Sequence, residues 1–98
     1  MADIHIQRTH TLGLPRAREL AQQWATQAET EWGLRCTRTE GEAEDEWALL
    51  RSGVRGSLRV SAQTFACQLQ LGFLLSAYQV RIQAAMEENL DRLLADTA

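Results

Sequence analysis

The chain has 98 residues, of which 45% are hydrophobic, so it is long enough to bury a core and is not predicted to be disordered. The formal net charge of −3 argues against a nucleic-acid binder that relies on neutralising phosphates. All ten basic residues are arginines. From the length we expect residues 1–98 to form a single domain.

No apolar run is long enough to span a bilayer, and the N-terminus lacks the apolar core of a signal peptide. The sequence therefore predicts a cytoplasmic protein without a membrane span. The two cysteines, Cys36 and Cys67, are too few for a disulfide framework, and both fall at inward positions of predicted strands. We expect both to be buried, reduced thiols.

The N-terminal part predicts a strand followed by a helix. Residues 3–7 alternate between apolar and polar side chains, which is typical of a short strand. Pro15 suits a first helical position, and apolar residues then recur every three or four positions as far as Trp32. Gly33 follows at once and is predicted to end this amphipathic helix in a left-handed conformation.

The stretch of residues 47–78 is the centre of the predicted fold. It holds three alternating segments separated by residues 52–56 and 61–64, both rich in turn formers, and so predicts a three-stranded meander. Residues 34–39 alternate in the same way and predict a further strand, whereas the acidic residues 40–46 are expected to be a solvated loop. The last alternating segment has apolar side chains that we place inward: Phe65, Cys67, Leu69, Leu71 and Phe73.

The C-terminal helix has a well-defined start signal. Ser76 and Gln79 have the spacing of a capping box. Leu75 and Val80 are placed for a hydrophobic staple across it. One apolar stripe then follows the helix, formed by Tyr78, Ile82, Ala85, Met86, Leu90, Leu93 and Leu94.

The element order is therefore β-α-β-β-β-β-α, and the predicted fold class is α+β. Strands joined by short turns pair antiparallel, so we predict a curved antiparallel sheet of four to five strands. Apolar side chains occupy one face of the strands, so both helices should cover that face while the other stays in water. The arrangement is analogous to the TBP-like or helix-grip architecture, an analogy that carries no function.

Four short motifs occur along the chain in a characteristic order: HTLGL at residues 10–14, RSGVRGSLRV at 51–60, LGFLL at 71–75 and LDRLL at 90–94. Together they resemble the small polyhydroxyalkanoic acid system protein family, over nearly the whole chain. The resemblance implies an accessory role around bacterial polyester granules, with no catalytic residues to transfer. The chain departs from the family after LGFLL, where a basic residue is expected: residues 77–79 are Ala-Tyr-Gln, and Arg81 is the first cation.

No residue pattern indicates catalysis or a metal centre. His5 and His10 are the only histidines, and neither has a cysteine or carboxylate at ligand spacing. No serine or cysteine stands in a nucleophile motif, and the acidic residues are expected to be solvated. We therefore expect no metal, no cofactor and no enzymatic activity.

Two surfaces are candidate binding sites. Leu74 is apolar at an outward position where the last strand ends, and with Tyr78 it can form a small patch that docks on a polyester surface or a partner. The open sheet face can bind an anion or a partner or simply be solvated; its candidate residues are His5, Arg35, Arg59, Gln68 and Gln70. The three tryptophans are expected in the core, or else one of them lines a pocket between helix and sheet.

The function predicted from the resemblance is that of a non-catalytic accessory protein of polyhydroxyalkanoate storage, associated with the granule surface or a granule protein. The alternative is a small carrier that binds an acyl or other apolar ligand between the C-terminal helix and the sheet, and an enzyme acting on hydroxyacyl units is a third. A lined cavity would favour the carrier, and an exposed apolar patch the granule protein. No nucleic-acid partner is expected, and the oligomeric state stays open, a homodimer included.

Overall fold

The structure, a computed structural model, describes residues 2–97. Within this range, five strands and two α-helices follow one another in the predicted order, with one short 3₁₀-helix before the last α-helix. Their bounds are β1 Ala2–Thr9, α1 Leu14–Trp32, β2 Arg35–Thr39, β3 Glu44–Arg51, β4 Val54–Ser61, β5 Thr64–Leu71, η1 Ser76–Tyr78 and α2 Gln79–Thr97.

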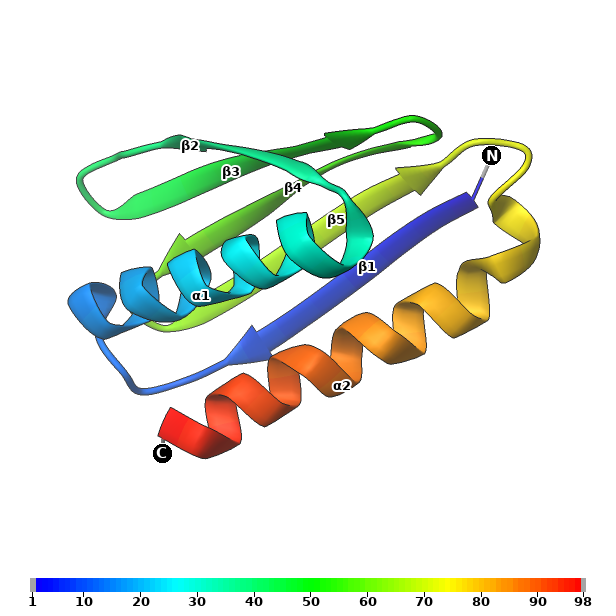
Figure 1. The fold of residues 1–98 in the computed structure, drawn as a ribbon. Helices are drawn as coiled ribbons and strands as arrows, with labels where there is room; N and C mark the ends of the chain where they lie inside the picture. Colours follow the sequence, from blue (N-terminus) through cyan, green and yellow to red (C-terminus); the bar gives the residue numbers. More distant parts are fainter. Residues whose placement is uncertain (1, 98) are drawn as a thin grey trace.

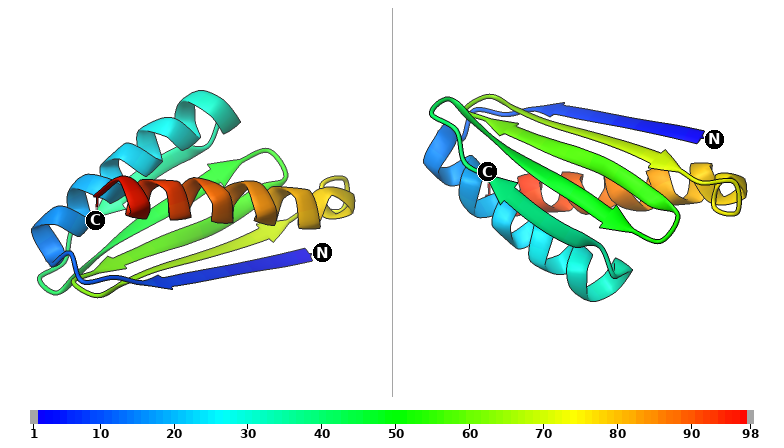
Figure 2. Two further views of the ribbon diagram at one scale, coloured as in Figure 1. Left: turned by 90° about the horizontal axis from the view of Figure 1, so that it is seen from below. Right: turned by 90° about the horizontal axis from the view of Figure 1, so that it is seen from above.

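The strands form one antiparallel sheet in the order β1-β5-β4-β3-β2. Strands β2 to β5 are neighbours in chain order, while β1 pairs with β5, so the first and last strands of the chain lie side by side. Helices α1 and α2 both cover the same face of this sheet (Figure 1, Figure 2). The predicted α+β class, the element order and the placement of both helices are therefore confirmed.

The core lies between this covered face and the two helices. One row of inward positions crosses the sheet through Ile4, Leu69, Gly56 and Leu49. Only glycine fits in the middle of this row, because a Cβ on Gly56 would collide with the carbonyl oxygen of Gln68 and the side chain of Leu69. The side chain of Leu69 thus packs directly over the backbone of β4.

Helix α1 begins and ends as the sequence predicts. Pro15 stands in its first turn, where a missing N–H leaves no hydrogen bond unmade. Gly33 ends the helix in the left-handed conformation, with φ 66°, and its N–H donates to the carbonyl oxygen of Ala28. The buried side of the helix is formed by Ala17, Leu20, Ala21, Trp24, Ala25 and Ala28.

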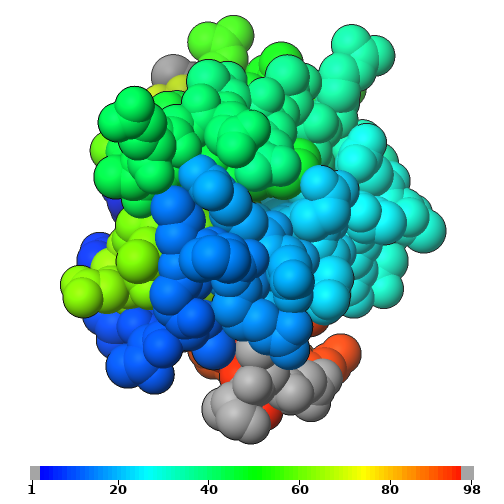
Figure 3. All heavy atoms as spheres, turned by 90° about the vertical axis from the view of Figure 1, so that its left-hand side faces the viewer, coloured from blue at the N-terminus to red at the C-terminus, as the bar shows by residue number. Residues whose placement is uncertain are grey.

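The acidic segment of residues 40–46 is only partly the solvated loop that was predicted. β3 begins inside it, and Asp45 faces inward with an exposed fraction of only 1%. Its carboxylate accepts hydrogen bonds from Arg18 at 3.1 Å, Arg38 at 3.1 Å and the backbone N–H of Gly41 at 3.3 Å. The loop prediction was wrong for these residues because two arginines compensate the burial of a carboxylate at a strand position. Figure 3 shows the segment that follows β2 (green) lying directly on the start of α1 (blue).

The start of α2 also differs from the prediction. The Ser76 hydroxyl donates to the carbonyl oxygen of Phe73 at 2.8 Å, and the Gln79 amide donates to the carbonyl oxygen of Asp3 at 2.8 Å. The capping box is therefore absent, because the chain enters α2 through the tighter 3₁₀ turn of η1 and Gln79 reaches across to β1 instead. Val80 is 83% exposed, so the predicted hydrophobic staple was wrong as well.

Helix α2 lies over the sheet more loosely than α1. Among its described side chains, the buried ones are Met86, Asn89 and Leu90. On the β1 side, Arg8 holds the helix through its Nε, which lies 2.7 Å from Oδ1 of Asp91. The predicted apolar stripe continues toward the start of α2, but Ala85 in that stripe is exposed. The first turns of α2 therefore leave space above the sheet.

Candidate functional site

The segment that joins β5 to α2 exposes several large apolar side chains. Phe73 is 85% exposed, Leu74 82% and Val80 83%, while Tyr78 is 53% exposed. We call these four residues the exposed apolar segment. They lie within eight consecutive positions, and none of the residues between them is charged.

Backbone geometry explains why this segment leaves the sheet. The N–H of Gly72 donates to the carbonyl oxygen of Gly53 at 2.8 Å, and the chain then turns, with the N–H groups of Leu75 and Ser76 donating to the carbonyl oxygen of Gly72. The predicted outward position of Leu74 is found in the structure, whereas the inward position predicted for Phe73 was wrong. Alternation stops at this turn because no neighbouring strand continues beside it.

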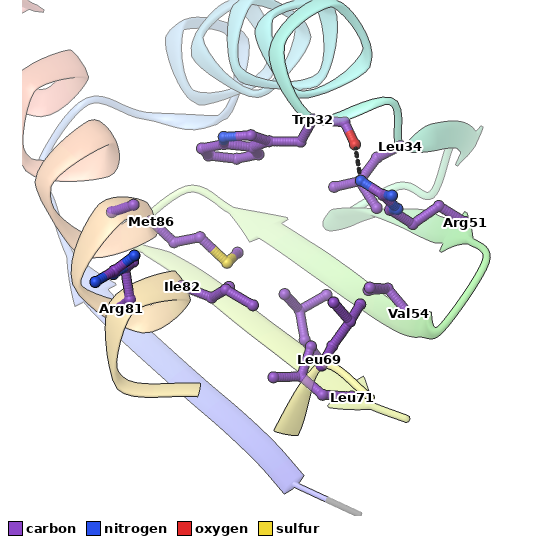
Figure 4. A pocket seen from close by; sticks show the side chains of 11 residues that line it. Trp32, Leu34, Arg51, Val54, Leu69, Leu71, Arg81, Ile82 and Met86 are labelled. Carbon is purple, nitrogen blue, oxygen red and sulfur yellow. Dashed lines mark hydrogen bonds between the residues drawn. The ribbon is translucent and has the colours of Figure 1, made fainter. Parts of the chain in front are cut away.

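An apolar cavity of about 240 Å³ lies between the first turns of α2, the end of α1 and the sheet (Figure 4). In Figure 4 the side chains of α2 stand on one side and those of the strands on the other, with Trp32 of α1 above them. Its walls are mainly apolar, and the lining residues are Trp32, Leu34, Arg51, Val54, Leu69, Leu71, Leu75, Arg81, Ile82, Ala85 and Met86.

Two arginines are the charged residues of this lining. Arg51, at the end of β3, donates from Nη1 to the carbonyl oxygen of Trp32 at 2.6 Å, which fixes its guanidinium at the edge of the cavity (Figure 4). Arg81 comes from the opposite wall, on α2. Among the described residues, neither arginine forms an ion pair, and the cavity lining contains no carboxylate. The cavity therefore combines an apolar interior with a positive rim.

The tryptophans divide between core and cavity. Trp24 and Trp47 are buried, as expected for core residues. Trp32 is half-buried, lies edge-on to Trp24 with ring centroids 6.2 Å apart, and lines the cavity. The alternative of a tryptophan beside a pocket between helix and sheet thus applies to Trp32 alone among the three.

The open sheet face brings together only some of its candidate residues. His5, Gln68 and Arg59 line one pocket of about 260 Å³ across β1, β5 and β4. Gln70 lies in the next row, beside Arg55, and Arg35 is on β2, three strands away from β5. Arg35 lies in the same row as Arg55, two strands away from it, and Arg59 is four residues further along β4. At the usual strand dimensions roughly 16 Å separates the backbones of Arg35 and Arg59, so the two predicted arginines do not converge on one anion.

The histidines are not grouped for metal binding. His10 accepts a hydrogen bond at Nδ1 from the backbone N–H of Leu12 at 3.1 Å, and its ring centroid lies 4.7 Å from that of Phe65. His5 is exposed on the opposite, open face of the sheet. No group of three His, Cys, Asp or Glu side chains in residues 2–97 is arranged to hold a metal ion.

The two cysteines are free thiols: Cys67 is buried, as predicted, whereas Cys36 is only half-buried against the core. Burial raises the pKa of Cys67 to about 12. Burial, with a smaller contribution from the charge of Glu29, raises the pKa of Cys36 to about 11. Both thiols therefore stay protonated near neutral pH, and neither has the lowered pKa of a nucleophilic cysteine.

Sequence reasoning found part of this site. It singled out Leu74 and Tyr78 but placed Phe73 inward in the sheet and Val80 in a hydrophobic staple, although the triplet Phe-Leu-Leu after the last strand is itself a signal of apolar excess. It did not find Arg51, because the cavity joins elements that are distant in sequence.

The fold and the two apolar features define a small α+β protein with an open-faced sheet, an exposed apolar segment and an apolar cavity with an arginine rim. Residues 4–94 match the family described as "putative polyhydroxyalkanoic acid system protein", and the chain belongs to this family. The resemblance inferred from the four motifs is therefore confirmed, and membership supports an accessory role related to polyhydroxyalkanoate. Comparison with curated proteins and with solved structures gives no match. Neither described helix has the length and apolar character needed to cross a membrane.

Proposed function

We propose that this protein is a non-catalytic accessory factor of polyhydroxyalkanoate storage that docks on the cytoplasmic polyester granule through the exposed apolar segment. The observation that carries the proposal is the exposure of Phe73, Leu74 and Val80, each more than four-fifths open to solvent within eight residues. Single exposed apolar residues are ordinary, but several large ones in one short segment mark an interaction surface.

The chemistry of the segment favours an uncharged aliphatic surface. Peripheral proteins that bind anionic lipid usually place Lys or Arg beside their apolar anchors. Residues 73–80 contain no charge, Arg81 is the one cation that directly follows them, and the chain as a whole has a net charge of −3. A polyester offers apolar contact without negative headgroups, so it fits this segment better than a phospholipid surface.

Docking is tested with Leu74→Glu, which replaces one exposed apolar side chain by a charge. Because Leu74 is 82% exposed, the thermal midpoint should change little while co-sedimentation with isolated granules is lost. Gln63→Glu, in the exposed turn between β4 and β5, adds the same charge elsewhere and should sediment like the unmodified protein.

Particles made from purified, protein-free polyester separate the two modes of attachment. Direct docking requires the unmodified protein to bind these particles and the Leu74→Glu variant to stay in solution. Binding to native granules but not to bare polymer would contradict direct docking and indicate a granule protein as the partner. Unchanged sedimentation of a folded Leu74→Glu variant would rule out this segment.

A further inference from the structure

We propose that the cavity between α2 and the sheet binds a medium-chain hydroxyalkanoic acid, with the aliphatic chain inside and the carboxylate held by Arg51. This inference concerns a different site from granule docking and can fail independently of it. It corresponds to the carrier alternative and specifies the ligand class, the chain length and the residues that recognise the acid.

The size of the cavity sets the chain length. A closed cavity of about 150 Å³ lined by Leu, Ile and Phe accommodates benzene, with six carbon atoms. In proportion, the volume of about 240 Å³ found here accommodates roughly ten carbon atoms. Leu69 and Leu71 from β5 face Ile82 and Met86 from α2 across this space, so a methylene chain meets apolar contacts on both sides (Figure 4).

The charges at the rim select the head group. Arg51 and Arg81 are the charged residues of the lining, and among the described residues no carboxylate pairs with either of them. Arg51 uses Nη1 for the Trp32 carbonyl group, which leaves further N–H donors of the same guanidinium for a ligand. Arginine binds carboxylates through charge-assisted, often bidentate, hydrogen bonds. An amphiphile with one carboxylate is thus complementary to the cavity and its rim.

The hydroxyalkanoic class follows from family membership, since such acids are the units of the polyester that the family description names. A free fatty acid shares the same carboxylate and aliphatic chain. The two sources differ in the hydroxyl group, so paired probes with and without that group distinguish them.

Binding is measured by isothermal titration calorimetry with the intact chain and with decanoate, 3-hydroxydecanoate, butyrate and decanol below their aggregation concentrations. One site per chain is expected, with the ten-carbon acids binding at least about tenfold more tightly than butyrate because more methylene groups are buried. Arg51→Gln should weaken the acids about tenfold and leave decanol unchanged. Arg55→Gln, on the open sheet face, is the matched control and should change nothing.

Filling the cavity supplies a second, independent test. Ala85 lines the cavity and Ala84 is exposed beside it on the same helix without lining it. Ala85→Trp should abolish binding of every ten-carbon probe, while Ala84→Trp should retain it, with equal thermal midpoints for the two variants. Leu74→Glu should bind the acids normally, because Leu74 does not line the cavity.

Several outcomes overturn the proposal. Absence of binding by both ten-carbon acids excludes the cavity as their site, and equal affinity for decanoate and decanol excludes recognition of the carboxylate. Retained binding in Ala85→Trp together with loss of binding in Leu74→Glu would show that the ligand binds at the exposed apolar segment and not in the cavity. Tighter binding of decanoate than of 3-hydroxydecanoate by about tenfold would replace the hydroxyalkanoic acid with a free fatty acid.

Discussion

Arg18 on α1 and Asp45 on β3 form an ion pair across the end of the sheet, with Nε of the arginine 3.1 Å from Oδ2 of a carboxylate that is only 1% exposed. Arg38 completes the arrangement from β2, with Nη2 at 2.8 Å from the same oxygen. Arg18 also donates to the carbonyl oxygen of Gly41 at 2.7 Å. The carboxylate of Asp45 and its partners thus link three elements: the start of α1, the β2–β3 loop and β3.

In this cluster Asp45 is buried whereas Arg18 and Arg38 are partly exposed. This difference predicts which variants lose more stability. Asp45→Ala leaves two arginines that are partly exposed and can hydrate, so we expect a loss of about 1–3 kcal/mol in unfolding free energy. The double variant Arg18→Ala, Arg38→Ala leaves a buried carboxylate without its two cations and should lose more, about 3–5 kcal/mol. Urea denaturation measures both, and the reverse order would contradict this account. Glu46→Ala, at the neighbouring exposed position, should lose less than about 0.5 kcal/mol.

Leu69→Ala should destabilise the fold by about 2–5 kcal/mol. Leu69 is 2% exposed and packs over Gly56 and beside Ile4 in the central row of the sheet. Gln70→Ala, at the adjacent outward position, is the control and should change stability by less than about 1 kcal/mol. Similar unfolding free energies for the two variants in urea would contradict the assignment of Leu69 to the inward face of β5 and of Gln70 to the outward face.

Most of the fold could be predicted because strand and helix periodicities report directly on burial. Each strand has one face against the helices and one in water, so alternation identified the strands and their inward sides. Local signals with a purely local cause also held, such as Gly33 at the end of α1. The predictions were wrong where a contact or strand end distant in sequence determines the local structure. Asp45 looked solvated because Arg18 lies 27 positions away, and the Phe73 side chain turned outward because the ladder ends at Gly72.

The candidate site was predictable only in its exposed part. Leu74 stood out because an apolar residue at an outward position violates the expected pattern, and the structure places it 82% exposed. No comparable pattern in the sequence indicated the cavity. Its lining comes from α1, three strands and α2, and each apolar residue in it, taken alone, looks like an ordinary core residue. Arg51 and Arg81 looked like ordinary surface cations until the fold placed them on opposite walls of one cavity.

Both thiols should react slowly in the native protein. With the pKa raised to about 11 for Cys36 and about 12 for Cys67, the thiolate fraction at pH 8 is roughly one in a thousand and one in ten thousand. An ordinary thiol with a pKa of 9.0 has roughly one in ten. Labelling by a thiol reagent should therefore accelerate strongly in denaturant. Fast stoichiometric labelling of the native chain would contradict the inward placement of both residues.

The same pKa shifts predict how stability changes in alkali. The folded state holds the thiol protons more tightly than the unfolded state, so the contribution is complete below the unfolded pKa near 9.0. It is lost as the pH rises from about 9 toward about 11 for Cys36 and about 12 for Cys67. In the Cys67→Ala variant the decrease in unfolding free energy over this range should be smaller than in the unmodified protein. An equal decrease in both would show that Cys67 does not cause it.

Docking on polyester should respond differently to two salts. Residues 73–80 carry no charge, so raising sodium chloride from about 0.1 M to about 1 M, which screens exposed charges, should leave the bound fraction nearly unchanged. Sodium sulfate strengthens apolar association and should increase it. Co-sedimentation with protein-free polyester particles measures both effects, with Leu74→Glu as the variant that should stay in solution in either salt. Release by sodium chloride would mean that the arginines, and not the exposed apolar segment, carry the contact.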